Sequence, residues 1–499
     1  MTKLTLDDLD RQFNPAYVLH TPHTVLSREL RPGCDRFIIA AAQNGTPVHE
    51  DAWGCLLTAS EHLRAEILVA PLRYKNPTSV FSGSQRNLEW WAPEVTPYLW
   101  NQRLQLNSNL MFLGDFQLQP TAVDPLAGMD GISGSMSGIF GHTKVRLRSV
   151  ATPQNKMAKT ITTTGACTIP NYTASRAGKT AEFHHVLGGL LVELHPNGRH
   201  FWIRQLYYSE ATGRILDLDD CYTSRGHSKA PPALAGIGGD THVRFLDPMV
   251  HDARHREGGF LDTIQCENWI EHDLLDAYSC NPHHDKNPMI WLATRLAQKD
   301  SIEDEIDEVA CYLEGLRDRY PKTHIHVVAS NHDDMATRAA LAFMKGGLQA
   351  IPHVSPVNLA WLGRTVAEMA SNCRLAEHGT EYPDALALHL AKAKLGKRVH
   401  ILSGRDSLML GGVEHAMHGD DGPNGSRGSV RNIARIGVKT WTGHGHSKEI
   451  FEGAKRVGTG TRLYADYTHG PSSWTNADGL TNADGKGQLI DYIDGKFRL

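Results

Sequence analysis

Side chains that can bind a metal ion stand at five separated places in the second half of the chain. The first is Asp240 with His242, directly after the small, apolar run 235–238. Side chains two residues apart project to the same side of a strand, so one strand end can present a carboxylate and an imidazole together. One such pair is weak evidence in a chain with 28 histidines, but further polar residues follow other apolar, β-branched stretches. In chain order these are Asp273, Asn331 with His332 and Asp333, His418, and His444 with His446.

Strands that alternate with helices would bring these residues together. We predict a strand over 235–239, a helix over 301–320 and a strand over 323–329. Two more apolar stretches, 399–403 and 438–442, precede the segments that carry His418, His444 and His446. This alternation predicts a layered α/β sandwich. Polar sites in open α/β sheets form at the carboxyl ends of the strands.

The first half of the chain carries no catalytic motif that we recognise. Strand 36–42, helix 51–64 and strand 66–71 predict a βαβ unit, and alternating apolar residues after about 143 predict antiparallel strands. A domain boundary is expected in the polar, proline-rich segment 224–232. The predicted parts are a polar N-terminal arm (1–35), an N-terminal α/β or α+β domain (36–230) and a C-terminal domain (235–499). The N-terminal domain has no assigned role, with DNA binding and oligomerisation as its candidates. The sequence Thr-Asn-Ala-Asp-Gly occurs at 475–479 and again at 481–485, and predicts paired turns.

Composition narrows the class of protein. A chain of 499 residues is too long for one core and should hold two or three domains. With 40% hydrophobic and 21% charged residues, it has the composition of a soluble globular protein. No apolar run is long enough to span a bilayer, and the N-terminus lacks the regions of a signal peptide. The eight cysteines form no Cys-x-x-Cys pair, which indicates reduced thiols, mostly packed in the core, and a cytoplasmic location. The net charge of −4 argues for no partner by itself.

By order and residue type, the motifs resemble those of the calcineurin-like metallophosphoesterases, and among these the SbcD-type nucleases. The resemblance covers about residues 236–470 and rests on Asp-x-His, Asp, Asn-His-Asp, His and Gly-His-x-His in the family's order. It implies that the C-terminal domain is a β-sandwich flanked by helices. Over its whole length, the chain also resembles the pre-early DNA-transfer nucleases of the tequintavirus group of tailed phages.

The resemblance implies two divalent metal ions, with Mn²⁺ expected and Fe²⁺ or Zn²⁺ as alternatives, since carboxylate, amide and imidazole ligands suit all three. It assigns one ion to Asp240, His242, Asp273 and His446, and the other to Asp273, Asn331, His418 and His444. Asp273 would then bridge two ions that clamp a phosphodiester and activate a water. His332 is not a ligand in the family, and is expected to stabilise charge on the phosphate or to protonate the departing oxygen.

The chain departs from the family pattern at two positions. His272 precedes the bridging carboxylate and Ser330 precedes Asn-His, where the family usually has glycine. The first departure leaves Asp276 and Asp262 as competitors of Asp273 for the bridging position. His272, His283 and His284 are expected to be surface residues or neighbours of ligands.

Two groups of basic residues are candidates for contact with DNA phosphates. Arg427, Arg431 and Arg435 recur every four residues and would form one stripe on a helix. Lys144, Arg146 and Arg148 alternate along a predicted strand and would project from one face. Trp90, Trp91 and Trp100 are expected to pack in the core or at an interface rather than to stack on bases.

The leading hypothesis is a dinuclear metal-dependent DNase, a phage protein for host DNA degradation or DNA transfer that acts in the host cytoplasm. We expect DNA as partner, a homo-oligomer, no membrane span, and an association with a second phage protein. A phosphatase or cyclic-nucleotide phosphodiesterase would use the same ligands. A DNA-transfer or scaffold protein with a secondary nuclease site is the third alternative.

Overall fold

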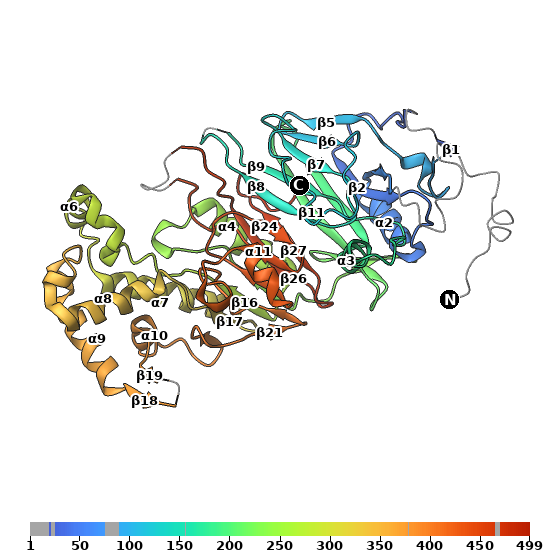
Figure 1. Cartoon of the computed structure of the whole chain (residues 1–499). Helices are drawn as coiled ribbons and strands as arrows, with labels where there is room; N and C mark the ends of the chain where they lie inside the picture. The colour runs from blue at the N-terminus through green and yellow to red at the C-terminus, as the bar shows by residue number, and fades with distance from the viewer. Residues whose placement is uncertain (1–18, 21–24, 75–88, 155, 378, 465–469) are drawn as a thin grey trace.

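The computed structural model describes residues 19–20, 25–74, 89–154, 156–377, 379–464 and 470–499. The described part has a mixed α/β fold with three large sheets of seven, six and ten strands. The predicted α/β class is therefore confirmed. Helices α7, α8 and α9 lie at one end of the molecule, and strands β2, β5 and β6 lie at the other (Figure 1). Of the predicted N-terminal arm, residues 1–18 and 21–24 lie outside the described residues.

The seven-stranded sheet belongs to the N-terminal half. Its order is β14-β13-β12-β11-β10-β2-β3. β2 and β3 are parallel and are joined by α2 (Glu50–Leu63), which confirms the predicted βαβ unit. The strands are β2 (Arg36–Gln43), β3 (Glu66–Leu72), β10 (Gly188–Leu194), β11 (Phe201–Ser209), β12 (Arg214–Asp217), β13 (Asp220–Thr223) and β14 (Gly226–Lys229).

The six-stranded sheet has helices on one face. Its order is β20-β17-β16-β15-β26-β27, with the first four strands parallel. Apolar side chains of β16 and β17 pack against helices on this face in the largest core of the molecule. The strands are β15 (Ala235–Ile237), β16 (Asn268–Glu271), β17 (His324–Val327), β20 (Val399–Ile401), β26 (Ala477–Thr481) and β27 (Gly487–Asp491). The helices between β15 and β20 are α4 (Pro248–His255), α5 (Phe260–Ile264), α6 (Pro288–Leu296), α7 (Ile302–Arg319), α8 (Asp333–Gly346), α9 (Leu359–Ser371) and α10 (Ala385–Leu390).

The ten-stranded sheet packs against the other face of the six-stranded sheet. Ile237 and Leu489 of one sheet meet Trp441 and Ile450 of the other in a shared apolar core. The order is β21-β22-β23-β25-β24-β8-β9-β7-β6-β5. Its strands are β5 (Arg103–Asn107), β6 (Leu110–Leu113), β7 (Ser137–Phe140), β8 (Leu147–Val150), β9 (Lys159–Thr163), β21 (Met409–Leu410), β22 (Val413–Glu414), β23 (Lys439–Thr442), β24 (Glu449–Phe451) and β25 (Ala454–Arg456).

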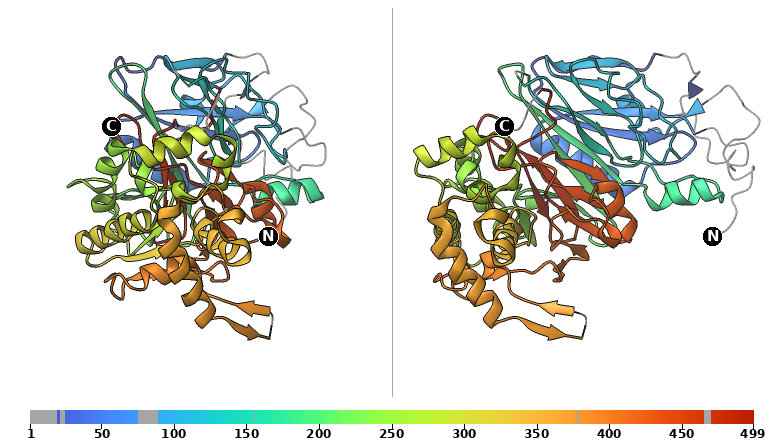
Figure 2. Two further views of the ribbon diagram at one scale, coloured as in Figure 1. Left: turned by 90° about the vertical axis from the view of Figure 1, so that its left-hand side faces the viewer. Right: turned by 60° about the vertical axis from the view of Figure 1, so that its left-hand side comes forward.

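This sheet contains strands from both halves of the chain. β8 pairs with β24 through Leu147 and Ile450, so hydrogen bonds cross the domain boundary predicted near residue 230. The division into domains stays a prediction, and the two halves are joined by one continuous sheet. Smaller elements are β1 (Leu19–His20) paired with β4 (Glu89–Trp90), α3 (Arg176–Phe183), α11 (Val430–Ile433), and the hairpin β18 (Arg374–Ala376) and β19 (Gly379–Glu381), which projects beyond α9 (Figure 2).

Two local predictions are wrong. The first Thr-Asn-Ala-Asp-Gly copy does not form a turn but enters β26, where its Asp478 is fully buried and pairs with Arg254. Only the second copy forms the turn between β26 and β27, where Gly485 has a positive φ of 74°. Lys144 and Arg146 are buried and do not project from an exposed face. Arg146 forms ion pairs with Asp124 and Glu449, which lie far from it in the sequence.

The prediction that the cysteines and tryptophans are buried is confirmed for most of them. Trp91 and Trp100 are buried, as expected. All eight cysteines are free; Cys311 and Cys373 are exposed, Cys34 is partly exposed, and the other five are buried.

Candidate metal centre

The seven predicted ligands and His332 gather at the carboxyl ends of the strands. Asp240 follows β15, Asp273 follows β16 and Asn331 follows β17, while His418 and His444 follow β22 and β23 of the facing sheet. Parallel neighbouring strands place their carboxyl ends at one edge, so residues far apart in sequence meet there.

One half of the cluster joins Asp240, His242, Asp273 and His446. Nε2 of His446 lies 3.1 Å from Oδ2 of Asp240 and 3.3 Å from Nε2 of His242. Nε2 of His242 lies 3.7 Å from Oδ2 of Asp273. All four side chains are buried.

The other half joins Asp273 to Asn331, His418 and His444. Oδ1 of Asn331 lies 2.9 Å from Nδ1 of His444 and 3.1 Å from Nε2 of His418. Nε2 of His418 lies 3.2 Å from Oδ2 of Asp273. The same carboxylate oxygen of Asp273 therefore lies near an imidazole of each half.

Asp276 and Asp262 have other contacts. Oδ1 of Asp276 lies 3.2 Å from Nδ1 of His242, on the side of the ring opposite Asp273. This contact fixes the imidazole so that Nε2 points into the cluster. Asp262 lies outside the cluster, where it pairs with Arg319 and accepts a hydrogen bond from the backbone of Gly258.

His332 lies beside the first half. Its ring centroid is 4.8 Å from that of His242, and its Nδ1 lies 3.0 Å from the backbone oxygen of Asp276. The ring is partly exposed. Its Nδ1 has the hydrogen-bond partner, and its Nε2 has none among the described residues. One ring nitrogen of His332 lies within 4.8 Å of ligand atoms of both His242 and Asp276.

The backbone around the cluster is strained. Four of the predicted ligands, His242, Asp273, His444 and His446, have positive φ angles between 41° and 69°. Non-glycine residues with positive φ are uncommon, and such strain collects at functional sites. Gly443 allows the tightest approach: a Cβ there would lie 2.2 Å from Oδ1 of Asp240, which accepts a hydrogen bond from the backbone of His444.

The cluster brings carboxylates and imidazoles together in a buried place. Burial favours the neutral form of Asp240, but the hydrogen bond and charge of His446 outweigh it and lower the pKa of Asp240 to about 2. Burial likewise opposes the charge of Asp273, and the charge of His418 holds its pKa well below the usual value. The carboxylates in turn overcome burial and raise the pKa of His418 to about 10 and that of His242 to about 9. The carboxylates are thus charged, and a divalent cation can replace the protons of His242 and His418 as the positive partner.

Two details of the donors fit a metal ion. The Nε2 atoms of His242 and His446 face each other, although only one of them can donate a proton to the other. Oδ1 of Asp273 is buried and, within the part of the chain that the structure describes, accepts no hydrogen bond. Such an oxygen is costly unless something positive pairs with it. The His/Asp groups of this cluster can therefore hold a metal ion, whereas its identity stays a prediction.

Sequence reasoning left two positions open for His272 and His284, at the surface or beside the ligands. His272 is fully buried beside the cluster, and neither ring nitrogen has a hydrogen-bond partner among the described residues. Burial lowers the pKa of His272 to about 3, and its ring lies 5.6 Å from that of His418. His284 is also buried, against Tyr278, whereas His283 is exposed as expected. The apolar strand just before residue 272 was the available signal for a buried histidine.

A cleft of about 1240 Å³ opens beside the second half of the cluster. Asn331 and His418 lie at its inner wall, and the β18–β19 hairpin forms part of its outer wall. Its charged lining is mixed, with the arginines Arg338, Arg374 and Arg405 and the carboxylates Asp333, Asp334, Glu381, Asp384, Asp406, Asp420 and Asp421.

The predicted arginine stripe does not lie on one helix. α11 contains only Arg431; Arg427 precedes the helix, and Arg435 lies in the 3-10 turn Ala434–Ile436. The guanidinium of Arg431 pairs with Asp124 and lies over the ring of Phe451. All three arginines are exposed, so contact with DNA stays a prediction, strongest for Arg427 and Arg435.

Among the described helices, none combines the length and apolar character required to cross a membrane. No family model matches the chain. The chain is similar to Protein A1 of Escherichia phage T5, with 29% identity over 489 residues, which cover 95% of this chain and 84% of the phage protein. This similarity along nearly the whole chain supports a relationship to T5-like phage proteins.

Proposed function

We propose that this protein is a metal-dependent DNase of the calcineurin-like metallophosphoesterase type, used by a phage to degrade host DNA or to transfer its own. The observation that carries the proposal is the position of Asp273, whose Oδ2 lies 3.2 Å from His418 and 3.7 Å from His242. One carboxylate between two sets of imidazole, carboxylate and amide ligands is the arrangement that a dinuclear centre requires.

The proposed ligands are Asp240, His242, Asp273 and His446 for one ion, and Asp273, Asn331, His418 and His444 for the other. When bound, two Mn²⁺ ions would supply positive charge to a phosphodiester and acidify a water. In this proposal Asp276 keeps His242 oriented, and Gly443 lets the backbone of His444 approach Asp240. His332 offers its partly exposed ring to the phosphate or to the departing oxygen.

The size of the cleft supports a polymeric substrate. At about 1240 Å³ it exceeds the roughly 300–1,000 Å³ of typical small-molecule sites. The carboxylates along its wall favour the alternative of a small phosphoester, since they would repel a polyanion. A phosphatase or cyclic-nucleotide phosphodiesterase is therefore the second candidate.

A parallel assay separates the two candidates. Protein stripped with EDTA is tested on plasmid DNA and on p-nitrophenyl phosphate, with and without Mn²⁺ or Ca²⁺. We expect no hydrolysis without metal, and recovery on DNA with Mn²⁺ but less with Ca²⁺, because Ca²⁺ prefers a larger shell of oxygen ligands. Hydrolysis of p-nitrophenyl phosphate alone would favour the phosphatase. Full DNA cleavage by metal-free protein would contradict both.

A further inference from the structure

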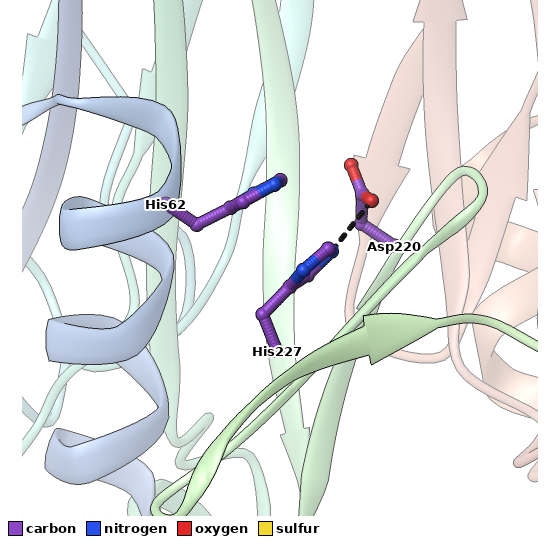
Figure 3. A group of neighbouring side chains, drawn as sticks. All are labelled: His62, Asp220 and His227. Atoms are coloured by element: carbon purple, nitrogen blue, oxygen red, sulfur yellow. Dashed lines mark hydrogen bonds and ion pairs between the residues drawn. The ribbon is translucent and has the colours of Figure 1, made fainter.

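A second group of metal-binding side chains lies in the N-terminal half, outside the candidate metal centre. His62 lies in the last turn of α2, Asp220 begins β13, and His227 lies on β14. The cross-strand register pairs Tyr222 with His227, so β13 and β14 present Asp220 and His227 together to the helix. Three elements thus contribute one donor each (Figure 3).

The three side chains lie within reach of one ion. Nε2 of His227 lies 2.8 Å from Oδ1 of Asp220. The rings of His62 and His227 are stacked, with centroids 3.6 Å apart and an angle of 16° between their planes. One donor atom from each residue lies within 4.8 Å of the other two. Figure 3 shows both rings extending toward the side on which the carboxylate of Asp220 lies.

The surroundings leave the donors available. Nδ1 of His62 lies 3.2 Å from the hydroxyl of Tyr222. This contact orients the ring and leaves Nε2 as the atom that can bind a metal ion. His62 and His227 are exposed and Asp220 is partly exposed, so an ion can enter from solvent. Lys229 competes weakly for Asp220: its Nζ is 3.8 Å away, and it bonds Asp219 at 2.7 Å instead.

We propose that His62, Asp220 and His227 bind a zinc ion that ties α2 to the β13–β14 hairpin. Two imidazoles and a carboxylate suit zinc and its neighbours Ni²⁺ and Cu²⁺ better than Mn²⁺ or Ca²⁺. The parallel rings must fan apart to aim both nitrogens at one ion, and exposed side chains change rotamer within nanoseconds. β14 is an edge strand whose four residues are all exposed, so a metal clip would hold the end of the sheet where packing does not.

Zinc titration of the full, metal-stripped chain tests the site. We expect His62→Ala and His227→Ala each to bind one equivalent of Zn²⁺ less than the wild type. Asp220→Asn should keep its neighbours in place and lose the same equivalent. The control is the double variant His195→Ala/His200→Ala, which removes the histidine pair in the turn between β10 and β11, with ring centroids 6.0 Å apart. Within the described residues, the nitrogens of these rings contact Asn197 and form no ion pair with a carboxylate. It should bind as much zinc as the wild type.

Amide hydrogen exchange in β13 and β14 measures whether zinc holds the hairpin against α2. At free Zn²⁺ of about a hundred times Kd, amides of β13 and β14 that exchange by opening of the hairpin should slow by up to about a hundred-fold in the wild type, and not in His227→Ala. Equal zinc stoichiometry in the wild type and all three ligand variants would overturn the proposal. Unchanged exchange in the hairpin would overturn the clip. Neither readout depends on DNA hydrolysis, so failure of the proposed nuclease activity would leave this test intact.

Discussion

The roles of Asp273 and Asp276 can be separated by the same substitution at each position. Asp273 lies between the two sets of imidazoles, whereas the carboxylate of Asp276 faces the outer nitrogen of His242. Replacing either carboxylate with asparagine keeps the shape and removes the charge. Asp273→Asn should therefore remove ligands from both ions, and Asp276→Asn should only loosen one ligand.

The size of the Asp276 effect can be estimated from His242. Despite burial, contacts with Asp276, Asp273 and Asp240 raise the pKa of His242 from 6.5 to about 9, so these carboxylates act strongly on its ring. Asp276 makes the closest of these contacts, at 3.2 Å. Removing the partner of a metal-bound histidine typically lowers metal affinity by about 10- to 100-fold, and we expect a loss in this range.

Metal analysis and activity together provide the assay. After dialysis against buffer with low free Mn²⁺, Asp276→Asn should retain less metal than the wild type and regain near-normal activity at saturating Mn²⁺. Asp273→Asn should stay inactive at every concentration. Asp262→Asn, outside the cluster, serves as the control and should match the wild type. If Asp273→Asn keeps both metals and Asp276→Asn cannot be rescued, Asp276 is the bridge and our reasoning from the distances fails.

Three further predictions concern single groups. His332→Ala should keep its metal content and DNA affinity while cleavage falls by about 100- to 1,000-fold, because one positioned donor is lost; loss of metal in this variant would make His332 a ligand. Arg427→Ala/Arg435→Ala should flatten the salt dependence of DNA binding by up to about two units of slope, measured by titration at several salt concentrations; Arg431→Ala, whose charge already faces Asp124, is the comparison and should change it less. Burial lowers the pKa of His142 to about 4, and its Nδ1 accepts the backbone N–H of Lys144 at 3.0 Å. As the pH falls, His142 becomes protonated in the unfolded chain before it does so in the folded protein. Its contribution to stability is therefore fully present above pH 6.5 and is lost as the pH falls toward 4, by up to about 2 kcal/mol at pH 5. The Tm of His142→Gln should fall less between pH 7 and pH 5 than that of the wild type, and an equal fall would refute this assignment.

The cluster could be predicted from sequence because the order of its motifs resembles that of a known family and most of them follow apolar stretches. Parallel strands bring such positions to one edge without any knowledge of the loops. The choice between Asp273 and Asp276 could not be made with the same certainty. Both carboxylates lie in one loop, and only the distances in the structure place Asp273 between the imidazoles.

Basic residues were harder to interpret because their partners are remote in sequence. The alternation of Lys144, Arg146 and Arg148 indicated a strand, but the strand β8 begins only at Leu147, so of the three only Arg148 lies in it. The alternation also did not indicate that Asp124 and Glu449 would enclose Arg146. The spacing of Arg427, Arg431 and Arg435 matched a helix, yet only four residues of that segment form one. Glycines at 428 and 437 limit a helix there, and Gly437 has a positive φ of 75°.

The sheet shared by both halves also sets the order in which this chain can fold. Arg146, just before β8, and its partner Glu449 in β24 are 303 residues apart. A ribosome that adds about 5–20 residues per second needs about 15–60 s to cover that interval. During this time β8 lacks its neighbour β24, and an unpaired strand edge can bind other chains. The ten-stranded sheet is therefore completed only near the end of synthesis, after most of the C-terminal half has left the ribosome.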